Sequence, residues 1–185
     1  MRNRQILLAE HETFETERLL LRKITLDDAE EIFEYASDPE VTRYMSYEAH
    51  KNLETTLAKI VEFFIHKRPE NWGIVYKADN KLIGSIDLRI DGDQADFGWT
   101  LHRAYWGQGL VAEAASALRD FAFNTLELNV LVAEHNVENT QSGRVMSKLG
   151  MRKIGHLWLY VAKLDKSVLT DYWAITREEY DNLGK

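Results

Sequence analysis

The sequence predicts a mixed α/β (α+β) fold, with a central, mostly antiparallel sheet of about seven strands flanked by about four helices. Apolar residues recur with helical spacing in several stretches. Short β-rich segments bounded by turn residues lie between them, giving the order β-α-α-β-β-β-α-β-α-β-β. Such a sheet covers its faces with helices. The 185 residues contain only 2 prolines and no linker-like stretch. We therefore expect one domain over 1–185, with 1–13 as an extension whose order the sequence does not determine.

The first third of the chain is predicted to hold one strand and two helices. Residues 18–22 form the strand. Thr25 and Asp28 have the spacing of a capping box, which starts a helix over 29–37. Residues 41–45 form a short helical turn. The second helix is indicated by apolar residues on one face, namely Leu53, Leu57, Ile60, Val61 and Phe64.

The remaining two thirds alternate between strands and helices. Asn139 is a favoured residue at a helix start and Gly150 at a helix end, so together they bound one of these helices. The predicted strands are 72–77, 82–90, 95–101, 130–133, 153–161 and 170–176, and the predicted helices are 110–123 and 139–149.

Composition and charge narrow the class of protein. The net charge is −7, which argues against a nucleic-acid binder and suits a cationic substrate such as an amine. The chain has no cysteine, so disulfides, thiolate metal sites and cysteine nucleophiles are excluded. The apolar run 6–9 is too short for a signal peptide, and no segment reaches membrane-spanning length. We expect a cytoplasmic protein, monomer or homodimer, with no membrane partner.

The six histidines show no spacing typical of zinc ligands, so no metal site is expected. We expect most of these histidines to lie at the surface. His102 and His135 are the two that we place at the rim of a cleft.

Residues 107–112, Gly-Gln-Gly-Leu-Val-Ala, lie between a predicted strand and a predicted helix. Glycines there let the backbone approach a ligand, and the helix start offers N–H groups to an anion. The string also satisfies the dinucleotide fingerprint G-x-G-x-x-A, with Glu134 as a candidate ribose ligand. Two features disfavour that interpretation: residues 102–106 separate the strand from the first glycine, and the unit follows three predicted antiparallel strands.

The flanks of this loop resemble a known family. Residues 97–101 and 105–114 are similar to the acetyl-CoA motif of the GCN5-related N-acetyltransferases (GNAT), and most similar to the RimJ/RimL-like branch of ribosomal-protein N-terminal acetyltransferases. Residues 16–22 resemble the opening strand of that branch. Residues 139–142 with 145 and 148–151 resemble its last-helix motif, and 171–180 its closing strand and tail. Three positions depart from the wider pattern. Trp106 replaces the usual Gln or Arg at the head of the loop, as often happens in this branch. Val111 replaces a Gly or Ala, and Met146 replaces a tyrosine proposed as a general acid.

The resemblance implies that acetyl-CoA is the co-substrate. The backbone amides of 107–112 would hold its pyrophosphate, and an amide near Thr100 or Leu101 would donate to the thioester carbonyl as negative charge develops there. The cofactor-binding set it implies is Leu101, His102, Arg103, Trp106, Gly107, Gln108, Gly109, Leu110, Val111, Ala112 and Asn139.

Two residues are predicted to take part in the chemistry. Asp96 lies where related proteins often have a glutamate, as a base acting through water or as an anchor for the ammonium group; the alternative is a surface aspartate on an alternating strand. Ser142 lies one turn after Asn139 and would hydrogen-bond the thiol; the alternative is an ordinary helix serine. Glu113, in the first helical turn, is expected only to favour the helix dipole.

We predict an amine N-acetyltransferase that acts by direct attack of the amine on the thioester. A protein α-amine has a reference pKa of about 7.7–8.0, against about 10.4 for lysine, so an N-terminal amine needs little help from a base. A protein or peptide N-terminus is therefore the favoured acceptor. The alternatives are a polyamine or aminoglycoside acetyltransferase, a non-catalytic acyl-CoA-binding module, and a nicotinamide-dependent oxidoreductase.

Overall fold

The computed structural model describes residues 3–66 and 70–184, and they contain one eight-stranded sheet in the order β1-β2-β3-β4-β5-β6-β8-β7. Among the described residues, β5 and β6 run parallel and every other neighbouring pair is antiparallel. The strands are β1 (Phe14–Glu15), β2 (Leu19–Arg22), β3 (Asn71–Tyr76), β4 (Lys81–Asp91), β5 (Gln94–Leu101), β6 (Val130–Asn136), β7 (Arg152–Val161) and β8 (Lys166–Thr176).

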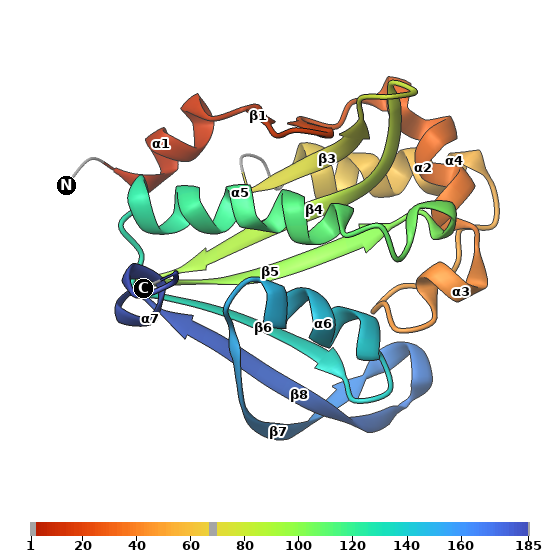
Figure 1. Ribbon diagram of the computed structural model, residues 1–185. Helices are drawn as coiled ribbons and strands as arrows, with labels where there is room; N and C mark the ends of the chain where they lie inside the picture. The colour runs from red at the N-terminus through yellow and green to blue at the C-terminus, as the bar shows by residue number, and fades with distance from the viewer. Residues whose placement is uncertain (1–2, 67–69, 185) are drawn as a thin grey trace.

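Helices cover both faces of this sheet (Figure 1). Helix α5 (Leu110–Asn124) packs on one face with α1 (Arg4–Glu10) and α6 (Thr140–Lys148), and α2 (Ala29–Ala36) packs on the other with α4 (Leu53–Lys59). The shorter helices are α3 (Pro39–Thr42) and α7 (Arg177–Asp181), and single turns are η1 (Leu26–Asp28), the π-helical η2 (Ile60–Ile65), η3 (Arg103–Tyr105) and η4 (Ala162–Leu164). In the described part of the chain, no helix has the length and apolarity needed to cross a membrane.

Two hydrophobic cores fix the orientation of the strands. The core beneath α5 includes Trp72, Phe97 and Phe123, and the core beneath α2 includes Ile60 and Leu82. Because side chains alternate along a strand, residues between the buried ones of β5 point away from α5. That alternation gives the sheet a polar stretch on the face opposite α5.

The fold class predicted from the sequence is confirmed, and most predicted elements are present. The capping box between Thr25 and Asp28 forms, and the Asn139 side chain accepts a hydrogen bond from the N–H of Ser142 at the start of α6. Gly150 ends that helix region with a φ of +79°. The described part of the extension 1–13, whose order the sequence left open, contains α1, and Leu8 of α1 is completely buried in the main core.

Strands β5 and β6 pair only at their beginnings, where residues 94–96 lie beside 130–132. Figure 1 shows the two strands diverging toward their C-terminal ends. The backbone beyond Asp96 therefore loses its neighbour on one side. The sheet is therefore open between the C-terminal ends of β5 and β6.

Candidate active site

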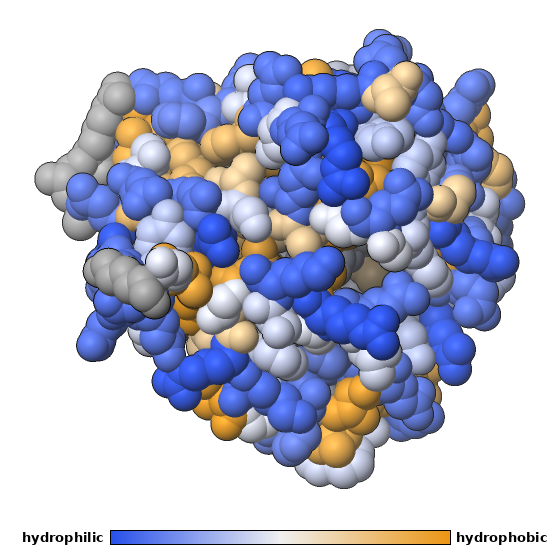
Figure 2. Space-filling model, viewed as in Figure 1, coloured by the Kyte–Doolittle hydropathy of each residue, from blue (hydrophilic) through white to orange (hydrophobic). Residues whose placement is uncertain are grey.

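A cleft of about 680 Å³ occupies the place where β5 and β6 diverge. Its walls come from the end of β5, the loop before α5, the end of β6, helix α6 and the segment around α3. Figure 2 shows the surface hollowed between the loop before α5 and helix α6. Elements that are far apart in the sequence therefore meet around one cavity.

The glycine loop forms one wall of the cleft. Gly107 and Gly109 have φ angles of +77° and +78°, a conformation that side chains with a Cβ rarely adopt. Gly109 is the N-cap of α5, and in the described residues no side chain caps that helix start. The first-turn N–H groups of a helix lack intrahelical partners and favour an anion. The loop thus presents N–H groups without a side-chain cap, which favour an anion.

Trp106 anchors this loop to the strand before it. Its indole Nε1 donates to the carbonyl of Leu101 at 2.8 Å. Tyr105 also lines the cleft, and its hydroxyl donates to Asp79 at 2.7 Å. This bond raises the pKa of Tyr105 to about 12, so Tyr105 is a poor proton donor.

Eight of the eleven predicted cofactor residues line the cleft, and three turn elsewhere. His102 lies 3.4 Å from Glu34 and Arg103 lies 3.7 Å from Asp38, so both side chains face α2 and the start of α3. The Gln108 side chain donates to the carbonyl of Ala104. The residues on the cleft wall are Leu101, Trp106, Gly107, Gly109, Leu110, Val111, Ala112 and Asn139.

The backbone amide of Leu101 points into the gap between the strands. His102 donates its N–H to the carbonyl of Ile83 on β4, at 2.7 Å. Successive N–H groups of a strand point to opposite edges, so the N–H of Leu101 points toward β6. Of the two amides predicted for the thioester carbonyl, Leu101 has the suitable direction.

Helix α6 brings cationic side chains to the cleft that sequence reasoning missed. Arg144 and Lys148 line it together with Gln141 and Val145. The Lys148 ammonium lies 3.7 Å from where a Cβ on Gly109 would be. These four positions follow the i, i+3, i+4, i+7 spacing of one helix face, so periodicity counted from Gln141 was the available signal.

The predicted base, Asp96, is not among the residues that line the cleft. It forms an ion pair with Arg89 at 2.6 Å, and Arg89 itself lines the cleft. Burial raises the pKa of Asp96, the Arg89 guanidinium opposes that rise, and the charge of Asp87 adds to it. Asp96 is therefore a charge inside a polar cluster, on the sheet face opposite α5.

Glu134 is the carboxylate that reaches the cleft. It lies on β6, two residues beyond the partner of Asp96 in the strand register. Its side chain is exposed to the cleft. Partial loss of solvation raises the pKa of Glu134, and the charge of Asp96 adds to the rise. The sequence interpretation connected Glu134 only with a nucleotide ribose, so its position here was missed.

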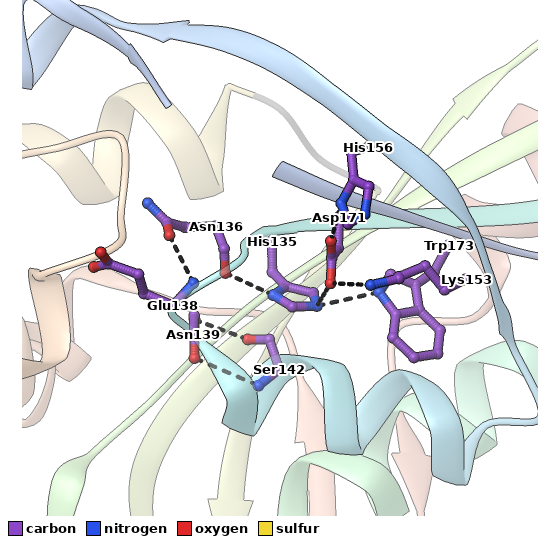
Figure 3. Close-up of polar contacts among 9 residues, drawn as sticks. All are labelled: His135, Asn136, Glu138, Asn139, Ser142, Lys153, His156, Asp171 and Trp173. Atoms are coloured by element: carbon purple, nitrogen blue, oxygen red, sulfur yellow. Dashed lines mark hydrogen bonds and ion pairs between the residues drawn. The ribbon is translucent and has the colours of Figure 1, made fainter. Parts of the chain in front are cut away.

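Asn139 and Ser142 form a closed pair at the start of α6 (Figure 3). The N–H of Ser142 donates to Asn139 Oδ1 at 3.4 Å, which leaves Asn139 Nδ2 to donate to Ser142 Oγ at 3.0 Å. The Ser142 hydroxyl thus accepts a hydrogen bond from Asn139, and its own proton can be donated to a group in the cleft. Met146 is buried in the core, so its side chain does not reach the cleft.

His135 connects this pair to the sheet (Figure 3). Its Nδ1 lies 2.7 Å from the carbonyl of Asn136, which also accepts the N–H of Asn139. The ring is 8% exposed and lines the cleft, as expected for His135, whereas His102 is not among the lining residues. His50 is also 8% exposed, so the surface expectation was wrong for His50. Within residues 3–66 and 70–184, no group of three or more His, Cys, Asp or Glu is arranged to hold a metal ion.

Comparison with known proteins agrees with this geometry. The family model for the acetyltransferase (GNAT) domain matches residues 18–152. The uncharacterized N-acetyltransferase p20 of Bacillus licheniformis is 30% identical over 175 residues, which cover 91% of this chain and 98% of p20. A GNAT-family acetyltransferase structure from Bacillus anthracis is 28% identical, with a TM-score of 0.81 over 90% of this chain and 99% of that one.

Two more distant structures share the fold. The spermidine N-acetyltransferase of Vibrio cholerae, in complex with CoA and spermine, is 20% identical with a TM-score of 0.73, covering 90% of this chain and 100% of that one. A candidate ribosomal-protein-serine acetyltransferase of the same organism is 21% identical with a TM-score of 0.75, covering 89% and 97%. The family match, the relatives and the cleft lead to one assignment: the chain belongs to the GNAT family and is an acetyltransferase.

Proposed function

We propose that the protein transfers the acetyl group of acetyl-CoA to the α-amine at the N-terminus of a peptide or protein, as RimJ/RimL-like enzymes do. The observation that carries this proposal is the position of Glu134. Its carboxylate, with a raised pKa, projects into the cleft that the glycine loop also lines. A base and an anion site thus share one cavity.

Acetyl-CoA would supply the thioester, and this chain would bind and orient it. The amides of 107–112 and the cations of α6 would hold the pyrophosphate. The N–H of Leu101 would donate to the thioester carbonyl. The eight predicted residues on the cleft wall, and the backbone of His102, Arg103 and Gln108, would complete the contact.

Glu134 would take the proton of the incoming ammonium group and pass it to solvent, which leaves the nitrogen lone pair to attack the acetyl carbon. As the C–S bond breaks, the nitrogen would lose its second proton, which reaches the thiolate through solvent, so that CoA leaves as the thiol. The Ser142 hydroxyl would donate a hydrogen bond to the departing sulfur and so stabilise its negative charge. Asp96, predicted as the base, would instead raise the pKa of Glu134 through its own charge. In this proposal Glu134 and Ser142 are the catalytic residues, and Asp96 acts only through Glu134.

The raised pKa of a carboxylate matches an α-amine better than a lysine amine. The acceptor must lose its proton before attack, and the reference values are about 7.7–8.0 for an α-amine and about 10.4 for lysine. A weak base can remove the proton of the α-amine at neutral pH with little cost. This supports a peptide N-terminus as the acceptor.

The charges around the acceptor end of the cleft also favour a peptide. Carboxylates come from Glu40, Glu134 and Glu138, and guanidinium groups come from Arg43 and Arg89. A peptide has one ammonium group followed by carbonyl acceptors, which suit this mixture. A polyamine offers only cations and hydrogen-bond donors, so it gives the guanidinium groups of Arg43 and Arg89 nothing to bind.

Thiol release tests the proposal. The purified protein is mixed with acetyl-CoA and, separately, with Ser-, Ala- and Met-starting peptides, their N-terminally blocked forms, polyamines and aminoglycosides. Release with unblocked peptides alone is expected. Release with small amines alone would overturn the peptide assignment. No release with any acceptor, while acetyl-CoA still raises the melting temperature, would indicate a non-catalytic acyl-CoA-binding module.

A further inference from the structure

Glu113, in the first turn of α5, turns toward the N-terminal strands. Its carboxylate accepts hydrogen bonds from Thr16 Oγ1 at 2.6 Å, from the Arg18 N–H at 2.9 Å and from Arg18 Nε at 2.7 Å. The side chain is 18% exposed. Burial raises the pKa of Glu113, but these donors outweigh it and lower the pKa on balance. The carboxylate is therefore ionised, and favouring the helix dipole is the lesser part of its role.

This contact determines where the Arg18 guanidinium lies. With Nε held by Glu113, Nη1 donates to the carbonyl of Gln108 at 3.1 Å. Nη2 lies 3.9 Å from where a Cβ on Gly109 would be. The planar guanidinium has fixed donor directions, so fixing Nε aims the other nitrogens. Arg18 thus lies against the glycine loop, 90 residues away in the sequence.

Gly109 is consequently flanked by two cations from different elements. Lys148 Nζ approaches it from α6 and Arg18 Nη2 approaches it from the start of β2. Glu113 neutralises part of this charge, but it is held behind Arg18 and its oxygens are occupied by donors. Lys148 lines the cleft and Arg18 lies beside the loop just outside that lining, so both cations stand next to the uncapped start of α5.

We propose that Arg18 binds the pyrophosphate of acetyl-CoA directly, and that Glu113 is the positioning residue that aims it. The inference rests on the proposed cofactor and adds a ligand from outside the glycine motif. A guanidinium donates two hydrogen bonds in the geometry that phosphate oxygens accept. The pyrophosphate is thereby held between the α5 amides, Lys148 and Arg18.

Calorimetric titration of the full chain with CoA tests the proposal without using turnover. Arg18→Gln is expected to raise the Kd for CoA about 10-fold or more, as expected for a lost charge-assisted hydrogen bond. Glu113→Gln is expected to raise it about 3- to 10-fold, and to have no further effect in the Arg18→Gln background. Arg18→Lys should restore only part of the affinity, because an ammonium group lacks the paired donors.

Lys77→Gln is the matched control. Lys77 pairs with Glu15 at 2.7 Å and donates to the Thr16 carbonyl, so it holds the same N-terminal segment without reaching the loop. Its Kd for CoA should equal that of the wild type. Circular dichroism and the melting temperature of each variant establish that the fold is retained.

Two further ligands separate the sources of the effect. Dephospho-CoA lacks the 3′-phosphate but keeps the pyrophosphate, so Arg18→Gln should weaken it as much as CoA. A loss confined to CoA would overturn the pyrophosphate assignment.

S-acetylpantetheine lacks both the 3′-phosphate and the pyrophosphate, and its kcat/KM should be the same in Arg18→Gln and the wild type. An equal loss with this substrate would show that Arg18 only maintains the loop and would overturn direct binding. If the wild type itself binds no CoA, the proposed function fails.

Discussion

The indole Nε1 of Trp173 donates a hydrogen bond to Nε2 of His135 at 3.1 Å. Because Nε2 is the acceptor, the ring proton lies on Nδ1, which faces the Asn136 carbonyl. The ring also touches α6, where Nε2 lies 3.0 Å from where a Cβ on Gly143 would be. The His135 ring, protonated on Nδ1 only, therefore contacts the sheet, the turn before α6 and the helix that carries Ser142.

Trp173→Phe should destabilise the protein by about 1–3 kcal/mol, because it leaves a buried acceptor without its donor. Chemical denaturation measures this, and ¹⁵N NMR of the wild-type imidazole should show the Nδ1–H tautomer. Trp158→Phe is the control, since Trp158 is 69% exposed on β7 and should change stability by less than about 0.5 kcal/mol. An Nε2–H tautomer in the wild type would contradict the assignment.

Ser142→Ala should lower kcat about 10-fold and leave the Kd for acetyl-CoA near the wild-type value, because its hydroxyl acts on the departing sulfur. Single-turnover kinetics measures the chemical step. Ser147→Ala on the exposed face of the same helix is the control and should leave kcat unchanged. Equal effects of the two substitutions would remove Ser142 from the mechanism.

Glu134→Gln should reduce kcat/KM about 10²-fold at neutral pH, within the range for loss of a general base. With a peptide α-amine as acceptor, the loss should shrink above about pH 8, where the amine deprotonates unaided. The measurement is kcat/KM of both proteins from pH 6 to 10. A loss that is constant across this range would argue against a base.

Asp96→Asn should shift the acidic limb of the kcat/KM profile to lower pH. The negative charge of Asp96 raises the pKa of Glu134, so its removal lowers that pKa. Glu134 then stays ionised, and able to accept a proton, at lower pH than in the wild type. A shift to higher pH would contradict the assignment, and a profile that loses its acidic limb altogether would make Asp96 the base.

Gly109→Ala should weaken CoA binding, because the residue has a φ of +78° and its Cβ would point toward Arg18 and Lys148. Gly92→Ala is the control, with a φ of +63° and open space around the added carbon. Both should lose about 1–2 kcal/mol of stability from the backbone conformation. Only Gly109→Ala should raise the Kd for CoA.

Asp28→Asn should destabilise the fold by about 1–3 kcal/mol at pH 7, because Asp28 is buried and pairs with the half-buried Arg22 at 2.6 Å. Burial raises the pKa of Asp28, but hydrogen bonds from Arg22 and Thr25 lower it on balance. Because the pKa of Asp28 is lower in the folded than in the unfolded state, its ionised carboxylate stabilises the folded state at pH values above the unfolded pKa of about 3.9. This stabilisation is lost as the pH falls through the folded pKa. The difference between variant and wild type should therefore shrink below about pH 4, whereas the exposed Asp27→Asn should differ little at any pH.

The sequence by itself determined the order of the elements, the glycine loop and the caps of α6. These features depend on local rules: apolar periodicity, the conformational freedom of glycine at 107 and 109, and the side chain of Asn139 three residues from its N–H partner. Each such rule operates within about one helical turn or one strand. Fold class and the position of the loop follow from them.

Only the tertiary structure decided which charges meet at the cleft. Arg18 and Glu113 are 95 residues apart, and Glu134 reaches the cavity because β6 diverges from β5 beyond Val132. A side chain's neighbours across a sheet depend on strand order and register, which one sequence encodes only through the whole folded core. For the same reason Asp96 is predicted by its motif as a cleft residue, yet the register places it beside Arg89 and behind Glu134.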